Sequence, residues 1–201
     1  MDVSKHYLEP LEGARAVAFV IGGAIFVADV ALLASHVAAG TEPAAFAQSL
    51  VGAAWTASFI GLLGTYPSLS SGSRWLARIG AVFAVIGGIT MAVMALASLG
   101  YSAGLLDGTL SDVVMLFLPG VSLGIVFGFG LFGVVILRTE TYSRTVGLLF
   151  LVLVLTFLFN LGSGIAGFGT LMTVLGVVAV LAVTKLALGY LFRTGNVATT
   201  G

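Results

Sequence analysis

Asp29 is the residue best placed to do chemistry, because it stands within a long apolar stretch that runs roughly from Arg15 to Val37. In a membrane-spanning helix a carboxylate costs roughly 2.5–3.5 kcal/mol on insertion scales, and such residues usually face the bundle interior and handle ions or protons. Counted from Arg15 at 1.5 Å per residue, Asp29 lies about 21 Å into the stretch, in its outer half. The alternative is a buried carboxyl group that hydrogen-bonds a neighbour and serves only packing.

A polar layer at the depth of Asp29 is the candidate site that the spacing predicts. Counting along other apolar stretches places hydroxyl and amide side chains at similar levels, and His36 follows Asp29 on the same helix face. The candidate site consists of Asp29, His36, Thr90, Ser122 and Asn160. Asn160 and Thr90 are the expected neighbours of Asp29. In the competing interpretation these groups only form interhelical hydrogen bonds of about 0.6 kcal/mol each.

Lys185 is the obvious partner for a buried carboxylate, but its depth argues against a direct pair. It precedes Arg193 by 8 residues, which is about 12 Å of helix. Asp29 is then expected about 9 Å further from that end of the bundle. A lysine stem can extend along a helix until its ammonium reaches the membrane interface. We therefore expect Lys185 to extend toward the interface beside Arg193 rather than to meet Asp29.

Six apolar stretches must position these residues, and a helix of about 20 residues is enough to cross a hydrocarbon core. Hydrophobic residues make up 59% of the 201 residues and charged residues only 8%, whereas soluble domains carry about 25% charged residues. The sequence predicts an all-α polytopic membrane protein with a single domain over residues 1–201. The predicted transmembrane helices span roughly 15–37, 46–66, 75–99, 113–137, 145–161 and 168–192.

The basic residues indicate the orientation of this bundle. In the six-helix arrangement all of them fall on one side, near the two termini and in the second and fourth connections, which is the positive-inside pattern. They are Lys5, Arg15, Arg74, Arg78, Arg138, Arg144, Lys185 and Arg193. The acidic residues Glu42, Asp107 and Asp112 fall on the opposite side. Both termini are therefore predicted in the cytoplasm, with the protein in the cell (plasma) membrane.

Gly120, Gly124 and Gly128 recur at every fourth position and form a double GxxxG pattern. Such a pattern gives a helix a smooth face against which another helix can pack closely. The partner is either a helix of the same chain or one of a second copy. Pro119 in the same helix is expected to kink it, because proline removes a backbone donor.

Several other classes of function lack the residues that they need. The chain has no cysteine and a formal net charge of zero, so it offers no thiolate metal site and no basic patch for nucleic acid. His6 and His36 are expected at opposite ends of the first helix and cannot jointly hold a metal or haem. No P-loop, HExxH or GxSxG pattern occurs. No cofactor, metal site or catalytic residue is predicted.

A glycine-rich segment followed by a short basic turn carries a resemblance to a known kind of protein. The segment comprises Gly124–Gly128, Leu131–Gly133, Leu137, Arg138, Tyr142–Arg144 and Gly147–Leu149. It resembles part of small six-helix integral membrane proteins of bacteria and archaea, in which a glycine-rich fourth helix ends in a basic turn that opens the fifth. The resemblance covers about a quarter of the chain and implies the fold but no activity.

The leading interpretation of the sequence is a non-enzymatic membrane protein, an accessory or structural subunit of a membrane complex. Its partners are then the lipid bilayer and either another membrane protein or a second copy. The alternative is a small transporter or channel that uses Asp29 to couple ions or protons. A transporter predicts a cavity that reaches Asp29, whereas a subunit predicts a packed interior. An intramembrane enzyme is the least supported, because one intramembrane acid is too few convergent groups for such catalysis.

Overall fold

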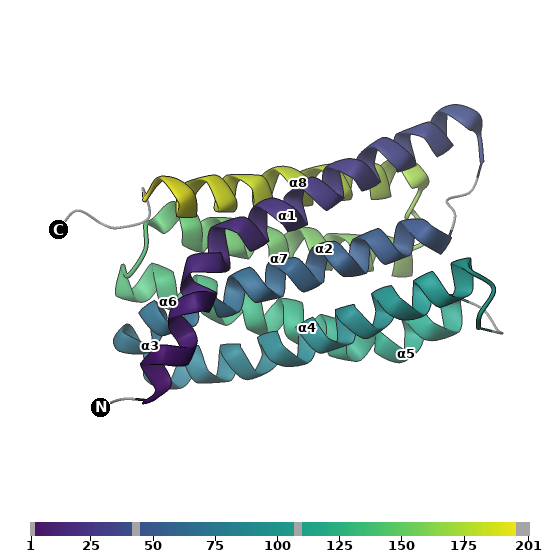
Figure 1. Cartoon of the computed structure of the whole chain (residues 1–201). Coiled ribbons are helices and arrows are strands. Elements are labelled where there is room, and N and C mark those ends of the chain that lie inside the picture. Colours follow the sequence, from purple (N-terminus) through teal and green to yellow (C-terminus); the bar gives the residue numbers. More distant parts are fainter. Residues whose placement is uncertain (1–2, 42–44, 107–109, 196–201) are drawn as a thin grey trace.

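The computed structural model describes residues 3–41, 45–106 and 110–195, and the regular elements within these ranges are all helices (Figure 1). In chain order they are α1 (Val3–Ala39), α2 (Ala45–Leu63), α3 (Tyr66–Gly72), α4 (Arg74–Ser102), α5 (Leu110–Leu123), the π-helix η1 (Gly124–Phe129), α6 (Gly130–Thr139), α7 (Arg144–Ile165) and α8 (Leu171–Thr194). The side chains of Glu42, Asp107 and Asp112 lie outside the described part of the chain, so their predicted position is not addressed.

Six segments of the described chain are long and apolar enough to cross a membrane, which confirms the predicted all-α bundle. The protein is therefore a multi-pass membrane protein. The segments are Glu12–Ala39, Phe46–Leu63, Arg74–Ser102, Val114–Thr139, Arg144–Ile165 and Leu171–Thr194. Figure 1 shows the long helices lying side by side, with the start of α1 and the end of α8 at the same end of the bundle. We call this end, where α1 begins and α8 ends, the arginine end. The opposite end, where α1 ends close to His36, is the His36 end.

Two parts of the chain are helical where the sequence did not predict a helix. α1 begins at Val3 rather than near Arg15, because its first turns carry charged residues that the search for apolar stretches excluded. Figure 1 shows these first turns running at an angle to the rest of the bundle. The serine-rich segment between the predicted helices 46–66 and 75–99 forms α3, which has proline in its first turn, where proline is tolerated best.

The turn between the last two spans lies later than predicted. α7 continues through Gly162 and Gly164 to Ile165 instead of ending at 161. A Cβ atom on either of these glycines would meet nothing within 4 Å, so they mark open surface rather than a break. The chain turns at Gly167, whose φ of +77° favours glycine.

The fourth span departs from α-helical geometry after Pro119 rather than at it. Pro119 lies inside α5, and the six residues of η1 follow from Gly124 to Phe129. The helix then resumes as α6. A π-helical turn is rare and occurs often at functional sites. In this molecule it carries Phe129 into the centre of the bundle, where that side chain is fully buried.

The double GxxxG pattern packs within the chain, against α4. A Cβ on Gly120 would lie 2.7 Å from the hydroxyl of Thr90, and one on Gly128 would lie 3.3 Å from the Cα of Ala84. A Cβ on Gly124 would overlap the Cα of Gly87. The backbones of the third and fourth spans are thus in contact at Gly87 and Gly124, which settles the choice between the two partners in favour of the same chain.

Glycines also let α1 lie close to both of its neighbours, α2 and α8. A Cβ on Gly22 would lie 2.7 Å from the backbone oxygen of Ala54 in α2, and one on Gly23 would lie 2.7 Å from the Leu186 side chain in α8. These approaches leave no room between the helices. The face of α1 that carries Gly22 is therefore covered by α2 on one side and by α8 on the other. Asp29 lies on this covered face.

Candidate functional site

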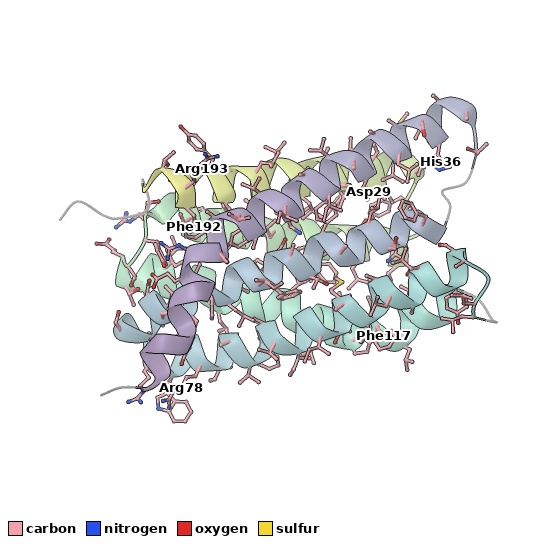
Figure 2. All side chains as sticks on the ribbon, in the orientation of Figure 1. Asp29, His36, Arg78, Phe117, Phe192 and Arg193 are labelled. Atoms are coloured by element: carbon pink, nitrogen blue, oxygen red, sulfur yellow. The ribbon has the colours of Figure 1, made fainter. Side chains whose placement is uncertain are left out.

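Asp29 is buried in the bundle, with an exposed fraction of 1%. This burial confirms that Asp29, labelled on α1 in Figure 2, faces the interior rather than lipid. Neither carboxyl oxygen has a hydrogen-bond partner in the described protein. Asn160 and Thr90, the expected neighbours of Asp29, therefore form no hydrogen bond with it. The hydroxyl of Thr90 donates instead to the backbone oxygen of Ile86 in its own helix, at 2.7 Å.

Lys185 is fully buried as well, and it does not extend toward the membrane interface. Its ammonium nitrogen lies 3.6 Å from the ring centroid of Trp55 and 4.2 Å from that of Phe26. Such cation–π contacts attract the ammonium to the face of a ring. The prediction that Lys185 extends toward the interface beside Arg193 was wrong, because a helical Cα–Cβ bond points toward the helix N-terminus. In α8 that direction leads away from Arg193 and toward the level of Asp29.

Asp29 and Lys185 are thus two ionisable groups of opposite sign inside the membrane-spanning part of the bundle. Neither the carboxyl oxygens nor the ammonium nitrogen has a hydrogen-bond partner in the described chain, and the two form no ion pair with each other, as the depth argument predicted. The ion pairs that the described residues do form, Arg15–Glu12 and Arg144–Glu140, lie at the arginine end. An unpaired charge inside a bilayer is costly, and residues of this kind are candidates for function.

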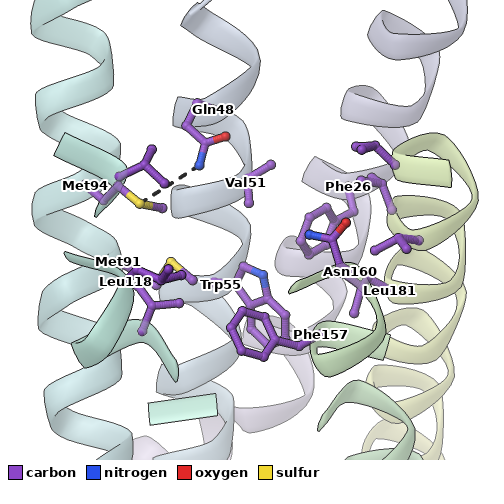
Figure 3. A pocket seen from close by; sticks show the side chains of 15 residues that line it. Phe26, Gln48, Val51, Trp55, Met91, Met94, Leu118, Phe157, Asn160 and Leu181 are labelled. Atoms are coloured by element: carbon purple, nitrogen blue, oxygen red, sulfur yellow. Dashed lines mark hydrogen bonds between the residues drawn. The ribbon is translucent and has the colours of Figure 1, made fainter. Parts of the chain in front are cut away.

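A central cavity of about 190 Å³ lies in the half of the bundle toward the His36 end, and all six spans contribute to its wall. Trp55 and Phe26, the two rings that hold Lys185, line it together with Met91, Met94 and Leu181 (Figure 3). The amides of Gln48 and Asn160 are its polar side chains. Neither Asp29 nor Lys185 lines the cavity itself, so the cavity that a transporter was expected to bring to Asp29 stops short of that residue. Trp55 and Phe26 both line the cavity and contact the ammonium of Lys185.

The polar layer that the sequence predicted is only partly assembled. Asn160 reaches the central cavity, and Thr90 packs against Gly120 outside it. Ser122 is half-buried in α5 and does not line the cavity. His36 lies at the end of the bundle (Figure 2), where a ring nitrogen is 2.9 Å from the hydroxyl of Thr41. None of these four groups therefore hydrogen-bonds Asp29, whose carboxyl oxygens have no partner among the described residues.

Gln48 is the cavity residue that sequence reasoning missed. Its amide nitrogen contacts the sulfur of Met94 at 3.9 Å, which ties α2 to α4 at the cavity wall. A glutamine within an apolar stretch carries the same signal as Asn160 and could have been included. Nothing in the sequence indicates that Met91 and Met94 belong to the cavity wall, because methionine is common in packed apolar interiors.

Below the cavity, toward the arginine end, the interior is filled by aromatic rings. Trp55 packs against Phe59 and Phe129, with centroid separations of 6.2 and 5.6 Å, and Phe129 in turn packs against Phe150 at 5.7 Å. Phe150 continues the contact to Phe19 at 5.9 Å. Offset and edge-to-face contacts of this kind stabilise a core beyond simple burial. They close the bundle between the cavity and the arginine end.

A second polar cluster joins four segments at the arginine end. One guanidinium nitrogen of Arg15 donates to Glu12 at 3.0 Å and to the hydroxyl of Tyr142 at 2.7 Å. Ser68 of α3 donates to the same carboxylate at 2.8 Å. Burial raises the pKa of Tyr142, a residue of the connection between α6 and α7, above its usual value. The cluster links α1, α3 and that connection, and the ring of Phe192 in α8 packs edge-on against Tyr142.

Comparisons with protein-family models, with curated proteins and with solved structures gave no match for this chain. Within the described residues no group of three or more His, Cys, Asp or Glu side chains could hold a metal ion. The function has therefore to be inferred from the chemistry of the two buried charges and the cavity beside them.

Proposed function

We propose that this protein is a small membrane transporter in which Asp29 and Lys185 bind and release a proton as a solute crosses the bundle. The observation that carries the proposal is the burial of both groups, at 1% and 0% exposure, without a protein hydrogen-bond partner for either. A purely structural bundle gains little from such residues, because a buried charge without a counter-charge or a hydrogen bond costs stability. Retaining both is understandable if their protonation changes during a working cycle.

The pair offers a simple way to change charge inside the membrane. An ammonium together with a carboxylate carries the same net charge as an amine together with a carboxylic acid. Loss of one proton by Lys185 and gain of one proton by Asp29 therefore remove both formal charges without altering the total. The rings of Trp55 and Phe26 contact the ammonium of Lys185, and an aromatic face attracts a cation but not an amine. Any movement of these two rings then changes which state is preferred.

The central cavity supports the proposal as the place where a solute would bind. It is built from all six spans and lies beside the rings that hold Lys185. In transporters, binding sites occur near the middle of the membrane, between the helices. A solute that displaced Trp55 or Phe26 would alter the surroundings of the ammonium, which links binding to protonation.

Proton movement in reconstituted vesicles tests the proposal. The purified protein is placed in liposomes that contain a pH-sensitive dye, and a potassium gradient with valinomycin supplies the driving force. We expect proton entry above that of empty liposomes, and we expect Asp29→Asn and Lys185→Met each to abolish the excess. Glu140→Gln, which removes an acid at the arginine end, is the matched control and retains the wild-type rate. Equal rates for wild type, Asp29→Asn and empty liposomes would reject proton handling by this site.

A second candidate function is an accessory subunit of a membrane complex. The observation that favours it is the filled aromatic interior toward the arginine end, which a static bundle would also have. In that case the protein should co-purify in mild detergent with a defined membrane protein, and Asp29→Asn should leave both the complex and the fold unchanged.

A further inference from the structure

The central cavity has the dimensions of a site for a small organic molecule. Its volume of about 190 Å³ exceeds the roughly 150 Å³ of an engineered apolar cavity that binds benzene. It is smaller than the roughly 300–1,000 Å³ of sites for drug-sized ligands. A single ring with one small substituent, or a branched aliphatic molecule of similar size, is therefore the largest ligand that it accepts without a change in shape.

Most of the cavity wall is apolar. Phe26, Val51, Leu118 and Leu181 are typical of the lining, and the sulfur atoms of Met91 and Met94 add polarisable surface (Figure 3). Methionine adapts its shape and packs well against aromatic rings. The body of a ligand should therefore be apolar, and an aromatic ring suits the wall best.

Two polar groups in this wall make no hydrogen bond within the described chain. The side-chain amide of Asn160 and the indole N–H of Trp55 both lack a partner there, whereas the amide of Gln48 already contacts Met94. An amide can donate and accept, and an indole N–H can only donate. Polar groups left without partners in an apolar site are satisfied by a ligand that carries complementary atoms. An amide or a hydroxyl group on the ligand provides them.

The lining contains no charged side chain. Asp29 and Lys185 are buried but do not belong to the wall, and the ammonium of Lys185 contacts Trp55 and Phe26, which do. A charged ligand would lose its hydration without gaining a counter-charge, which is strongly unfavourable in an apolar site. The ligand should therefore be uncharged.

From these observations we infer that the central cavity binds a small uncharged molecule with an apolar, preferably aromatic, body and one amide or hydroxyl group. The inference deepens the proposed function, since it names the class of solute that the transporter would carry. It is tested by binding alone. Binding of such molecules without proton movement would refute the transport proposal but not the site. Proton movement without binding would refute only the site.

Trp55 provides a reporter within the site itself. The chain has two tryptophans, and the other, Trp75, is largely exposed in α4, near the arginine end. Trp75→Phe therefore leaves Trp55 as the only tryptophan emitter. Benzamide is the probe. Toluene, benzoate and benzylamine are its apolar, anionic and cationic analogues and serve as controls. We expect a saturable change in Trp55 emission with benzamide, and a weaker response with each of the other three.

Two cavity variants separate binding from partition of the probe into detergent. Leu118→Phe fills part of the cavity and should abolish the saturable response. Asn160→Leu keeps the approximate volume and removes the amide, and should weaken benzamide binding by about two- to tenfold, the value of one hydrogen bond. Toluene binding should not weaken in Asn160→Leu. The thermal unfolding of each variant is recorded in parallel, and only variants that unfold cooperatively are compared.

Each outcome decides the inference. A saturable benzamide response that Asn160→Leu weakens supports it. A response that rises linearly and is identical in Leu118→Phe reports partition into the micelle and overturns it. Equal affinities for benzamide and toluene would overturn the role of the amide, and tighter binding of benzoate or benzylamine would overturn the requirement for an uncharged ligand.

Discussion

The ammonium nitrogen of Lys185 lies 3.6 Å from the centre of the Trp55 ring, deep in a bundle of membrane-spanning helices. The ammonium contacts this ring and that of Phe26, and Nζ has no hydrogen-bond partner among the described residues. The contact with Trp55 joins the buried charge to the wall of the central cavity. The stability of the bundle and the behaviour of the cavity should therefore both depend on this pair.

A double-mutant cycle measures the energy of this contact. Trp55→Leu should destabilise the protein more in the presence of Lys185 than in the Lys185→Met background, by about 1–2 kcal/mol, the value of a desolvated cation–π contact. The measurement is the free energy of unfolding in mixed micelles titrated with sodium dodecyl sulfate. If Trp55→Leu costs the same in both backgrounds, the ring does not stabilise the ammonium.

The contact between Gly87 and Gly124 predicts a strong response to one added methyl group. Gly124→Ala should lower stability by about 1–3 kcal/mol, because the new Cβ meets backbone that cannot move aside, and Gly124→Leu should do so more severely. Gly176→Ala is the matched control, since a Cβ there meets nothing within 4 Å. Thermal unfolding in detergent compares them. Equal melting temperatures for Gly124→Ala and wild type would show that these backbones are not in contact.

The cluster at the arginine end predicts a dependence of stability on alkaline pH. The pKa of Tyr142 is raised in the folded protein, so the folded state holds this proton more tightly than the unfolded state does. Its contribution is complete below the unfolded value of about 10 and is lost as pH rises through the folded value. Unfolding measured across this range should show the decline in wild type and a smaller one in Tyr142→Phe.

Tyr142→Phe has a second effect, at neutral pH. It removes the hydroxyl that accepts from Arg15 at 2.7 Å and should cost about 1–2 kcal/mol, as for hydrogen bonds that involve a charged group. Tyr190→Phe, on the exposed side of α8, is the control and should be neutral. A neutral Tyr142→Phe would mean that the cluster does not hold the four segments together.

The orientation of the bundle is predicted from the basic residues alone and is testable on this cysteine-free chain. In intact cells, a cysteine introduced at Thr141 should be protected from a membrane-impermeant thiol reagent, and one at Ile165 should react. Both residues lie in or beside connections between spans. Labelling of position 141 from outside would reverse the orientation.

Hydropathy alone predicted the fold, because a chain with so few charges can satisfy its backbone in a membrane only by forming helices. The glycine spacing predicted a close helix contact, and the structure supplied the partner, α4. The surroundings of Asp29 were not predictable in the same way. Counting residues gives the depth of a side chain but not the rotation of each helix about its axis, which decides whether Thr90 or Lys185 faces the same interior. The cavity depends on the rotation of all six spans at once.

Access of water to position 29 tests the central claim most directly, because a transporter must expose its proton-binding residue and a packed subunit need not. Asp29→Cys is treated in liposomes with a membrane-impermeant methanethiosulfonate reagent while a pH gradient is maintained. Ser102→Cys, exposed near the His36 end, gives the fully accessible rate, and Val27→Cys, on the outer surface of α1, gives the rate at a lipid-facing position. We predict a rate for Asp29→Cys between these two that rises with the gradient. A rate no greater than that of Val27→Cys under every condition would contradict the account.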